Sequence, residues 1–435
     1  MRLSVIGCGY LGAVHATAMA SLGHEVVGID VDEARIAILA DGRAPFFEPG
    51  LDELLTRTRD LGTLTFSTDM SRARGAAVHF IAVGTPQRAD GDGADLRYVE
   101  SAVDALVPLL APGDLVVGKS TVPVGTAAHL ADRIRATGAR LVWNPEFLRE
   151  GFAIEDTLRP DRLVYGVERD DAADRDVAVL DEVYRPAIDA GTPRVVTDYA
   201  TAELVKVSAN AFLATKISFI NAMAEVAEVT GADVTQLADA IGFDVRIGRR
   251  FLNAGIGFGG GCLPKDIRAF SARAEELGVG HSVRFLHEVD AINLRRRQRV
   301  ADLVGAALQG DPAGHHVAVL GLAFKPDSDD TRDSPALDVA RRLHAAGAVV
   351  HAYDPAAVET ARRVAPELVF ADSVAEAVRE AEVVVVATEW REFRDLSPEQ
   401  LAASTPARTI VDARNCLDPA AWRAAGWTYH GMGRP

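Results

Sequence analysis

Short apolar runs alternate with stretches of mixed polarity in the first part of the chain. Residues 3–6, 25–29, 77–83, 115–118 and 141–143 are mainly apolar, and polar residues or glycines follow each run. Residues 13–21 lie between the first two runs, have the composition of a helix and end before Gly23. Strands that alternate with helices in this way predict an α/β domain with a parallel sheet.

The turn after the first predicted strand has the sequence Gly7-Cys-Gly9-Tyr-Leu-Gly12, and the next strand ends at Asp30. Strand, glycine-rich turn, helix, strand and acid together form the dinucleotide-binding fingerprint. The glycines let backbone amides and the helix N-terminus approach a pyrophosphate, and Asp30 would accept a hydrogen bond from a ribose 2′-hydroxyl. Asp30 and Asp32 would repel a 2′-phosphate, so we predict NAD rather than NADP as the cofactor.

The same alternation returns near the C-terminus, although without the three glycines. Residues 317–320, 349–353, 382–387 and 409–411 are predicted strands, and Asp354 follows the second of them as Asp30 does in the first part. Between the two parts, apolar residues recur at helical spacing over residues 201–230, up to Gly231. We predict two Rossmann-like, doubly wound parallel-sheet domains joined by a long central helix and a helical linker. The expected domains are residues 1–198, 199–298 and 299–435.

The composition of the chain argues against several classes of protein. The formal net charge is −16, so the phosphates of nucleic acid would be repelled and no nucleic-acid partner is expected. The three cysteines, Cys8, Cys262 and Cys416, are widely spaced. This spacing forms neither a disulfide framework nor a metal site and fits a reducing cytoplasm. We find no secretion signal and no run of about 18 apolar residues, so no membrane span is expected.

Residues 257–266 place Cys262 after a run of glycines, with Lys265 and Asp266 directly beyond it. One interpretation is a tight turn with a buried, inert thiol, because free cysteines are among the most buried residues. The other is a loop with a reactive thiolate, which a neighbouring cation stabilises. A cysteine that only packs does not need Lys265 and Asp266 beside it, so the second interpretation is favoured.

Further polar residues follow predicted strands or share a helix face. Thr85, Thr121 and the segment 144–151 each follow a predicted strand, and ligands of open parallel sheets bind outside the carboxyl ends of strands. Lys206 and Asn210 are four residues apart on the long helix and share one face, which is either a solvated stripe or a functional surface. In the second sheet domain, Lys325 and Arg332 suit a phosphorylated ligand.

Together these motifs resemble the UDP-glucose/GDP-mannose dehydrogenase family, in order and over essentially the whole chain. The matching segments are residues 7–12, 84–86, 120–123, 144–151, 206 with 210, 257–266 and 324–332. Segments 144–151 and 262–266 are the most specific. The chain departs from the family at Val207, where an aromatic residue is common, at Ala222, where an acid is common, and at Gly261, where serine is frequent.

The resemblance implies an enzyme of nucleotide-sugar metabolism that supplies polysaccharide biosynthesis. It would oxidise the C6 alcohol of a UDP-sugar to a carboxylate with two NAD⁺, through a thiohemiacetal and a thioester on Cys262. Lys206 would stabilise the oxyanion with help from Asn210, and Asp266 would activate water. Glu146 and Thr121 would position water and substrate.

The resemblance also implies two sets of binding residues. The expected cofactor contacts are Gly7, Gly9, Tyr10, Leu11, Gly12, Asp30, Arg35, Thr85, Thr121, Glu150, Lys265 and Arg332. The expected substrate contacts are Glu146, Phe147, Leu148, Lys206, Asn210, Arg246, Phe251, Asn253, Gly257, Phe258, Gly259, Lys325 and Arg414. In the family, the residue at the position of Arg246 reaches the site of a neighbouring subunit, which implies a homodimer with a shared active site.

Three alternatives remain beside the favoured substrate, UDP-glucose. GDP-mannose comes next, because that branch of the family shares the sequence Cys-Leu-Pro-Lys-Asp. UDP-N-acetylhexosamines are less favoured, because Lys265 would usually be absent in enzymes that oxidise them. The alternative from another class is a catalytically silent NAD-binding regulator. Such a protein would be expected to lose Cys262, Lys206 or Asp266, and all three are present.

Overall fold

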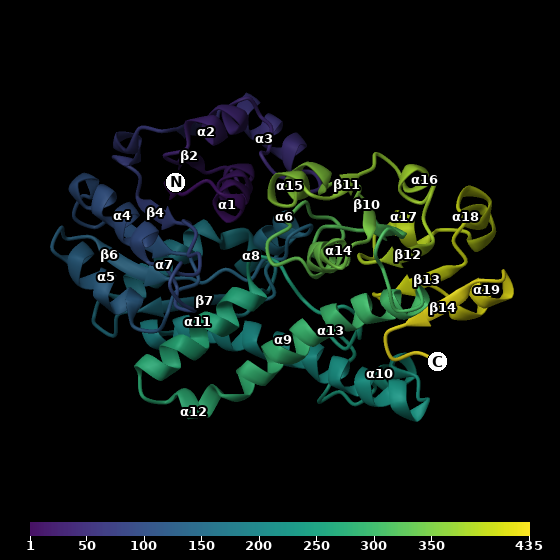
Figure 1. The fold of residues 1–435 in the computed structure, drawn as a ribbon. Helices are drawn as coiled ribbons and strands as arrows, with labels where there is room; N and C mark the ends of the chain where they lie inside the picture. The colour runs from purple at the N-terminus through teal and green to yellow at the C-terminus, as the bar shows by residue number, and fades with distance from the viewer. The chain divides into compact units, whose positions relative to one another are not determined.

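The computed structural model describes residues 1–435, which divide into two compact units. Unit 1 comprises residues 1–209 and 272–278, and unit 2 comprises residues 210–271 and 279–435. The N-terminal sheet, purple to blue in Figure 1, belongs to unit 1, and the C-terminal sheet, green to yellow, belongs to unit 2.

The sheet of unit 1 has eight strands in the order β3-β2-β1-β4-β5-β6-β7-β8. All neighbouring strands are parallel except β6 and β7, which form an antiparallel pair at Trp143 and Gly166. The strands are β1 (Arg2–Ile6), β2 (Glu25–Ile29), β3 (Leu64–Ser67), β4 (Val78–Ile81), β5 (Leu115–Gly118), β6 (Arg140–Trp143), β7 (Leu163–Val167) and β8 (Arg194–Asp198).

Helices cover both faces of this sheet. Because side chains alternate along a strand, Leu3 and Val5 of β1 join one apolar core and Ile6 joins the other. The helices are α1 (Tyr10–Ser21), α2 (Glu33–Ala40), α3 (Leu51–Asp60), α4 (Arg97–Leu106), α5 (Thr126–Arg135), α6 (Ala153–Leu158), α7 (Ala173–Val183) and α8 (Arg185–Asp189), with short 3₁₀ turns η1 (Met70–Ala73) and η2 (Val107–Leu109).

The sheet of unit 2 has six strands, all parallel, in the order β11-β10-β9-β12-β13-β14. Val317 and Val319 of β9 enter one core, and Ala318 and Leu320 enter the other. The strands are β9 (His316–Leu320), β10 (Val349–Tyr353), β11 (Val369–Phe370), β12 (Val383–Val386), β13 (Thr409–Asp412) and β14 (Thr428–Gly431).

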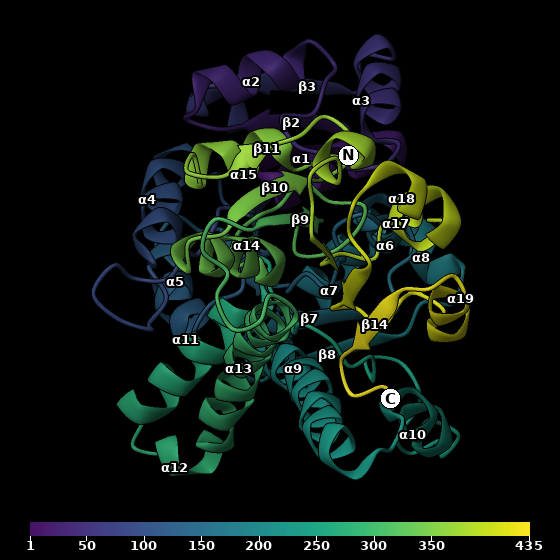
Figure 2. The same cartoon turned by 45° about the vertical axis from the view of Figure 1, so that its right-hand side comes forward.

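The helices after the first sheet include the longest of the chain, α9 (Tyr199–Thr230), with 32 residues. In unit 2, α9 packs along α13, where Ser218 Oγ donates to Val289 O at 2.7 Å (Figure 2). The others are α10 (Val234–Gly242), α11 (Leu263–Glu276), α12 (Gly280–Val283), α13 (Phe285–Ala307), α14 (Pro335–Ala345), α15 (Val358–Val364), α16 (Val374–Ala377), α17 (Arg391–Arg394), α18 (Pro398–Ser404) and α19 (Pro419–Ala424).

The predicted fold class is confirmed: two doubly wound sheets are joined through a long central helix. The predicted strands are found within a few residues of their expected ends; the run 77–83, for example, gives β4 (Val78–Ile81). The boundaries of the three expected domains stay a prediction. None of the helices has both the length and the apolar composition needed to cross a lipid bilayer.

Candidate active site

The turn between β1 and α1 leaves no room for side chains at its third glycine. A Cβ atom on Gly12 would lie 1.7 Å from Gly7 O, so any other residue would push the helix away from the strand. Gly9 is the N-cap of α1, and a Cβ atom there would meet nothing within 4 Å. The backbone at the N-terminus of α1 is thus left uncovered at Gly9, which agrees with the predicted binding of a dinucleotide pyrophosphate there.

Asp30, directly after β2, is held in place by the same turn. Its carboxylate accepts hydrogen bonds from Cys8 N at 2.7 Å and Asp32 N at 3.0 Å, and it pairs with Arg35 Nη1 at 3.1 Å. The side chain of Asp30 is 8% exposed. Two of the predicted cofactor contacts, Asp30 and Arg35, are thus brought together beside the glycine turn.

Glu48 links the turn to the segment that contains Glu150. Its carboxylate accepts from Tyr10 OH, from Gly151 N at 2.6 Å and from Ala153 N at 2.7 Å. Burial, followed by this hydrogen bond to Glu48, raises the pKa of Tyr10. Sequence reasoning missed Glu48, because it lies in a loop between two helices with no motif of its own.

Polar residues at the ends of β4, β5 and β6 meet as predicted. Thr85 Oγ1 donates to Thr121 O at 2.8 Å, and Ser120 Oγ donates to Val83 O at 2.7 Å. These contacts fix the segment of Thr121 against the loop after β4. The register explains them, because β5 lies between β4 and β6 and all three strands are parallel.

Glu146 forms a buried ion pair with Lys119, at 2.8 Å between Oε2 and Nζ. Lys119 also donates to Asn144 Oδ1 at 3.1 Å, and that oxygen accepts from Tyr184 OH at 2.9 Å. Burial opposes ionisation of Glu146. The charge and hydrogen bond of Lys119 and the N–H of Phe147 nevertheless hold the pKa of Glu146 below its usual value. Glu146 is therefore a carboxylate at neutral pH, which suits a residue that orients water or an alcohol.

Lys206 lies on α9 and is 9% exposed, which excludes a fully solvated stripe on that face. Its Nζ lies 5.4 Å from the ring centroid of Phe147, and its charge contributes to the lowered pKa of Glu146. Unit 1 thus brings Glu146, Phe147 and Lys206 together.

In unit 2, Asp266 accepts hydrogen bonds from two of the predicted site residues. Asn210 Nδ2 donates to Asp266 Oδ2 at 2.6 Å, and Lys265 Nζ pairs with Asp266 Oδ1 at 2.6 Å. Asp266 is only 3% exposed. Asn210 lies one helical turn beyond Lys206 on α9, so the two share a face of that helix as expected.

Cys262 is exposed, whereas Cys8 is buried and Cys416 is intermediate. Burial raises the pKa of both Cys8 and Cys416, so these two remain thiols at neutral pH. Lys265 and Asp266 were predicted in a loop, but they lie in the first turn of α11 (Leu263–Glu276). The loop ends at Cys262, and Asp266 N donates to Cys262 O at 2.9 Å. Proline is favoured in a first helical turn, so Pro264 explains why α11 begins there.

The remaining substrate contacts expected in unit 2 have separate local roles. Arg414 donates to Gly257 O at 3.0 Å and to Phe324 O at 2.8 Å. Asn253 Oδ1 accepts from Arg249 at 2.8 Å, and Phe251 has a positive φ of 66°. The side chain of Arg246 is 86% exposed and pairs with Asp244. For the substrate contact Lys325, Nζ lies 5.5 Å from the ring centroid of Phe324. Arg332, which was predicted as a cofactor contact, forms an ion pair with Asp330.

Three family models together match most of the chain. They are described as the NAD binding, central and UDP binding domains of the UDP-glucose/GDP-mannose dehydrogenase family, and they match residues 1–188, 200–295 and 318–419. A UDP-glucose 6-dehydrogenase of Rhizobium meliloti is 44% identical, with both chains covered completely. The UDP-glucose 6-dehydrogenase TuaD of Bacillus subtilis is 39% identical and covers this chain completely, with 93% of its own length matched.

The chain belongs to the UDP-glucose/GDP-mannose dehydrogenase family. Its fold agrees with a solved UDP-glucose dehydrogenase from the hyperthermophilic archaeon Pyrobaculum islandicum. The TM-score is 0.89 at 38% identity, with 100% of this chain and 98% of that chain covered. As a member of this family the chain is an NAD-dependent dehydrogenase with a UDP-binding domain, so the predicted enzyme class and cofactor are confirmed. The roles of individual site residues stay predictions.

One group of side chains outside the predicted site could hold a metal ion. The ligand atoms of His316, His351 and Glu380 lie within 4.8 Å of one another. The two imidazole rings are stacked, however, with an angle of 21° between their planes, and His316 Nδ1 already contacts His351 Nε2 at 3.2 Å. A shared metal ion would have to lie in the plane of both rings, so this arrangement suits a stacked histidine pair better than a metal centre.

Proposed function

We propose that the chain oxidises UDP-glucose to UDP-glucuronate in the cytoplasm, with two NAD⁺ per sugar. The observation that carries this proposal is Cys262, the one exposed cysteine, at the start of the helix that contains Lys265 and Asp266. Full-length identity of 44% to a relative named UDP-glucose 6-dehydrogenase supports UDP-glucose as the substrate. Bound NAD⁺, held by the glycine turn and Asp30, would accept the hydride in each of the two oxidations.

The chemistry assigned to Cys262 begins once the C6 alcohol has become an aldehyde. The thiolate forms a C–S bond to C6, and the carbonyl electron pair moves to oxygen to give a thiohemiacetal. Lys206 supplies the positive charge that the developing oxyanion needs, and Asn210 donates a hydrogen bond to it. Loss of the second hydride gives a thioester.

Hydrolysis then returns the free thiolate. Water adds to the thioester carbon, the C–S bond breaks and the carboxylate leaves with UDP still attached. Asp266 would remove the proton from this water, as Asn210 and Lys265 orient its carboxylate from two sides. Glu146, kept ionised by Lys119, and Thr121 would position water and substrate.

We also propose that the enzyme is a homodimer. Phe212, Phe219 and Val226 recur at seven-residue intervals on α9 and are 66%, 48% and 52% exposed. An apolar stripe of this kind on a long helix is typical of a surface that a second copy covers. The exposed Arg246 agrees with a residue that reaches the site of the partner subunit. Light scattering at several protein concentrations would test the dimer, and a monomer at all of them would contradict it.

The activity is tested by a panel of sugar nucleotides with product stoichiometry. We expect NADH formation with UDP-glucose, two NADH per sugar, and little with GDP-mannose or a UDP-N-acetylhexosamine. Faster turnover of GDP-mannose would reassign the substrate. A protein that binds NAD⁺ but forms no NADH with any of these sugars would be the silent regulator instead.

A further inference from the structure

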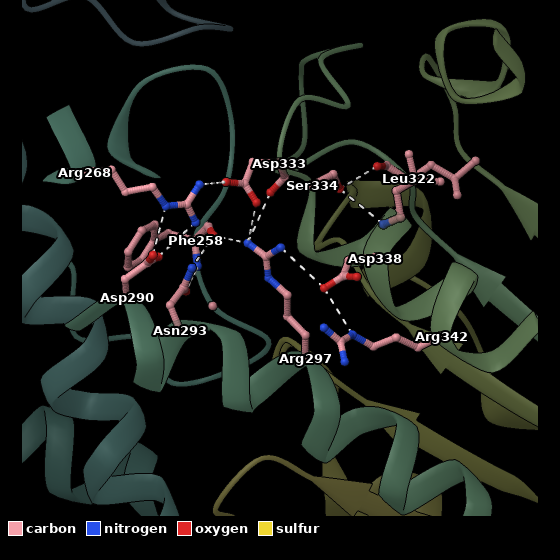
Figure 3. Close-up of polar contacts among 12 residues, drawn as sticks. Phe258, Arg268, Asp290, Asn293, Arg297, Leu322, Asp333, Ser334, Asp338 and Arg342 are labelled. Atoms are coloured by element: carbon pink, nitrogen blue, oxygen red, sulfur yellow. Dashed lines mark hydrogen bonds and ion pairs between the residues drawn. The ribbon is translucent and has the colours of Figure 1, made fainter. Parts of the chain in front are cut away.

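The loop before Cys262 is fastened to α13 by one asparagine. Asn293 is 0% exposed; its Oδ1 accepts from Phe258 N at 2.7 Å, and its Nδ2 donates to Phe258 O at 2.9 Å (Figure 3). Both backbone groups of Phe258 are therefore satisfied by one side chain, as they would be by a neighbouring strand. This fixes the backbone four residues before the cysteine.

Gly257 is the residue that makes this contact possible. A Cβ atom on Gly257 would lie 2.2 Å from Asn293 Oδ1, and the backbone there has a φ of 101°. A glycine is thus required by the asparagine, independently of any ligand.

Arg297 lies one turn beyond Asn293 on α13 and holds the same loop through a second route. Its side chain is 4% exposed, and it donates to Phe258 O and Asp333 O, each at 3.3 Å. It also pairs with Asp333 Oδ1 at 2.9 Å. The neighbouring Arg332 O accepts from Gly260 N at 2.9 Å, which adds another fixed point two residues before Cys262.

The chain after Cys262 is fastened to the same helix. Arg268 of α11 pairs with Asp290 of α13 at 2.9 Å and with Asp333 Oδ2 at 2.9 Å (Figure 3). Asp333 thus bridges Arg297 and Arg268 with its two oxygens. The chain is therefore bound to α13 on both sides of Cys262, through the loop before it and through α11 after it.

We propose that Asn293 and Arg297 are positioning residues for the Cys262 thiolate. The inference rests on the proposed function, in which sulfur must meet the C6 aldehyde before that aldehyde escapes. A misplacement of about 1 Å can cost roughly 100-fold in such a step. The first oxidation does not use the sulfur, so the position of the thiolate does not affect its chemistry. A displaced thiolate would therefore uncouple the two oxidations.

The number of NADH formed per sugar distinguishes a residue that positions the thiolate from one that only stabilises the fold. A variant that is only less stable has fewer active molecules, but each of them still forms two NADH per sugar. A variant with a displaced thiolate forms NADH in the first oxidation and releases aldehyde. The ratio of NADH formed to UDP-glucose consumed does not depend on the folded fraction.

The test compares Asn293→Ala with Asn221→Ala. Asn221 is also 0% exposed and accepts from Gly255 N at 2.9 Å, so its loss removes a similar buried contact from the same segment, farther from Cys262. For Asn293→Ala we expect kcat for the complete reaction to fall by about 10- to 100-fold, with an NADH ratio that falls from two towards one. A hydrazine reagent should trap the released aldehyde. Asn221→Ala should keep the ratio of two and yield no trapped aldehyde.

Arg297→Lys provides a second variant if Asn293→Ala does not fold. It keeps a cation for Asp333 but loses the planar fork that also reaches Phe258 O, so we expect a smaller fall of the ratio and less trapped aldehyde. A ratio of two with no trapped aldehyde in folded Asn293→Ala and Arg297→Lys would overturn the positioning role alone. A wild type that forms no NADH with any sugar nucleotide would overturn the proposed function and this inference together.

Discussion

The first strands of the two sheets, β1 and β9, lead into turns that start alike. Gly7 and Gly321 both have positive φ, 89° and 110°. Gly7 N donates to Ile29 O at 2.8 Å, and Gly321 N donates to Tyr353 O at 2.7 Å. In each sheet the aspartate directly after the second strand, Asp30 or Asp354, accepts from backbone N–H groups of that turn.

The two turns then differ in where the next helix begins and in how many hydrogen bonds the aspartate accepts. In unit 1, α1 begins at Tyr10, three residues after Gly7, and its N-terminus faces the fingerprint turn. In unit 2, α14 begins only at Pro335, and Ser334 caps it. Asp354 is 2% exposed and accepts from Leu322 N, Ala323 N, Ala356 N, Ala357 N and Trp390 Nε1.

The same aspartate position thus has two uses. Asp354 is fully occupied by its own protein, so its role is to build the second turn. Asp30 lies beside the N-terminus of α1, where a Cβ atom on Gly9 would meet no other atom, which agrees with its predicted role as a cofactor contact. The lesson is that an acid at the end of the second strand indicates a nucleotide site only together with the glycine turn and the early helix.

The largest effect is expected for a change at Cys262 in unit 2, which should slow the chemistry without changing cofactor binding in unit 1. Cys262→Ser should lower the rate of the complete oxidation by about 10³-fold or more, because an alcohol is a far weaker nucleophile than a thiolate. NAD⁺ affinity, measured by titration, should be unchanged. Full turnover with two NADH per sugar in this variant would remove the thioester mechanism.

Asp354→Ala should cost the most stability. Five donors would lose their acceptor in a buried place, so we expect the free energy of unfolding to fall by about 3–5 kcal/mol. Chemical denaturation measures this change, with Asp30→Ala as the matched comparison. A similar small loss in both variants would contradict the different roles assigned to the two aspartates.

Glu203 of unit 1 is another buried carboxylate that can be compared with Asp30 and Asp354. It is 2% exposed and accepts from Gly125 N and Ala127 N, both at 2.7 Å. Burial raises the pKa of Glu203 to about 7 from its usual 4.5, although both N–H groups act against this shift. Between these values the folded chain keeps a proton that the unfolded chain has lost, so stability falls as the pH rises.

The measurement is the pH dependence of unfolding for the wild type relative to Glu203→Gln. From pH 4.5 to pH 7 the wild type should lose roughly 3 kcal/mol more than the variant, which has no carboxyl to titrate there. Parallel profiles for the two proteins would show that Glu203 titrates alike in the folded and unfolded chains.

The smallest expected effect concerns Asp30. Asp30→Ala should raise the Kd for NAD⁺ by about 10- to 100-fold, because it removes a charged hydrogen-bond acceptor. Affinity for UDP-glucose should stay unchanged in the same calorimetric titrations. Asp32→Asn is the control, since it removes a nearby charge but keeps an oxygen that can cap α2. Equal losses for both ligands would argue against the ribose role of Asp30.

Much of the fold follows from local patterns in the sequence. The runs that became β1, β2, β5 and β10 are short, apolar and bounded by glycine or aspartate, and such strands are predicted by composition alone. Strand β8 has mostly exposed side chains and β14 is a short edge strand, so neither has a strong apolar pattern. The antiparallel pairing of β7 with β6 depends on tertiary packing and has no local signal.

Residues of the candidate site could be predicted where they belong to a recognisable sequence motif. Cys262, Asp266 and the glycine turn are of this kind, whereas Lys119, Glu48 and Asn293 act through partners that are 27, 103 and 35 residues away in sequence. One signal could have revealed Lys119, because it and Glu146 follow neighbouring parallel strands, β5 and β6. No comparable signal exists for Asn293, whose partner is a backbone group.

The three cysteines differ in their exposure to solvent, so the reaction of Cys262 can be measured in the unmodified protein. Cys8 is buried, Cys416 is partly buried and the pKa values of both are raised, whereas Cys262 is exposed. A mild electrophile at neutral pH should therefore add a single mass label, to the peptide that contains Cys262. The labelled fraction would count the competent molecules in any preparation, without an engineered tag or a cysteine-free background.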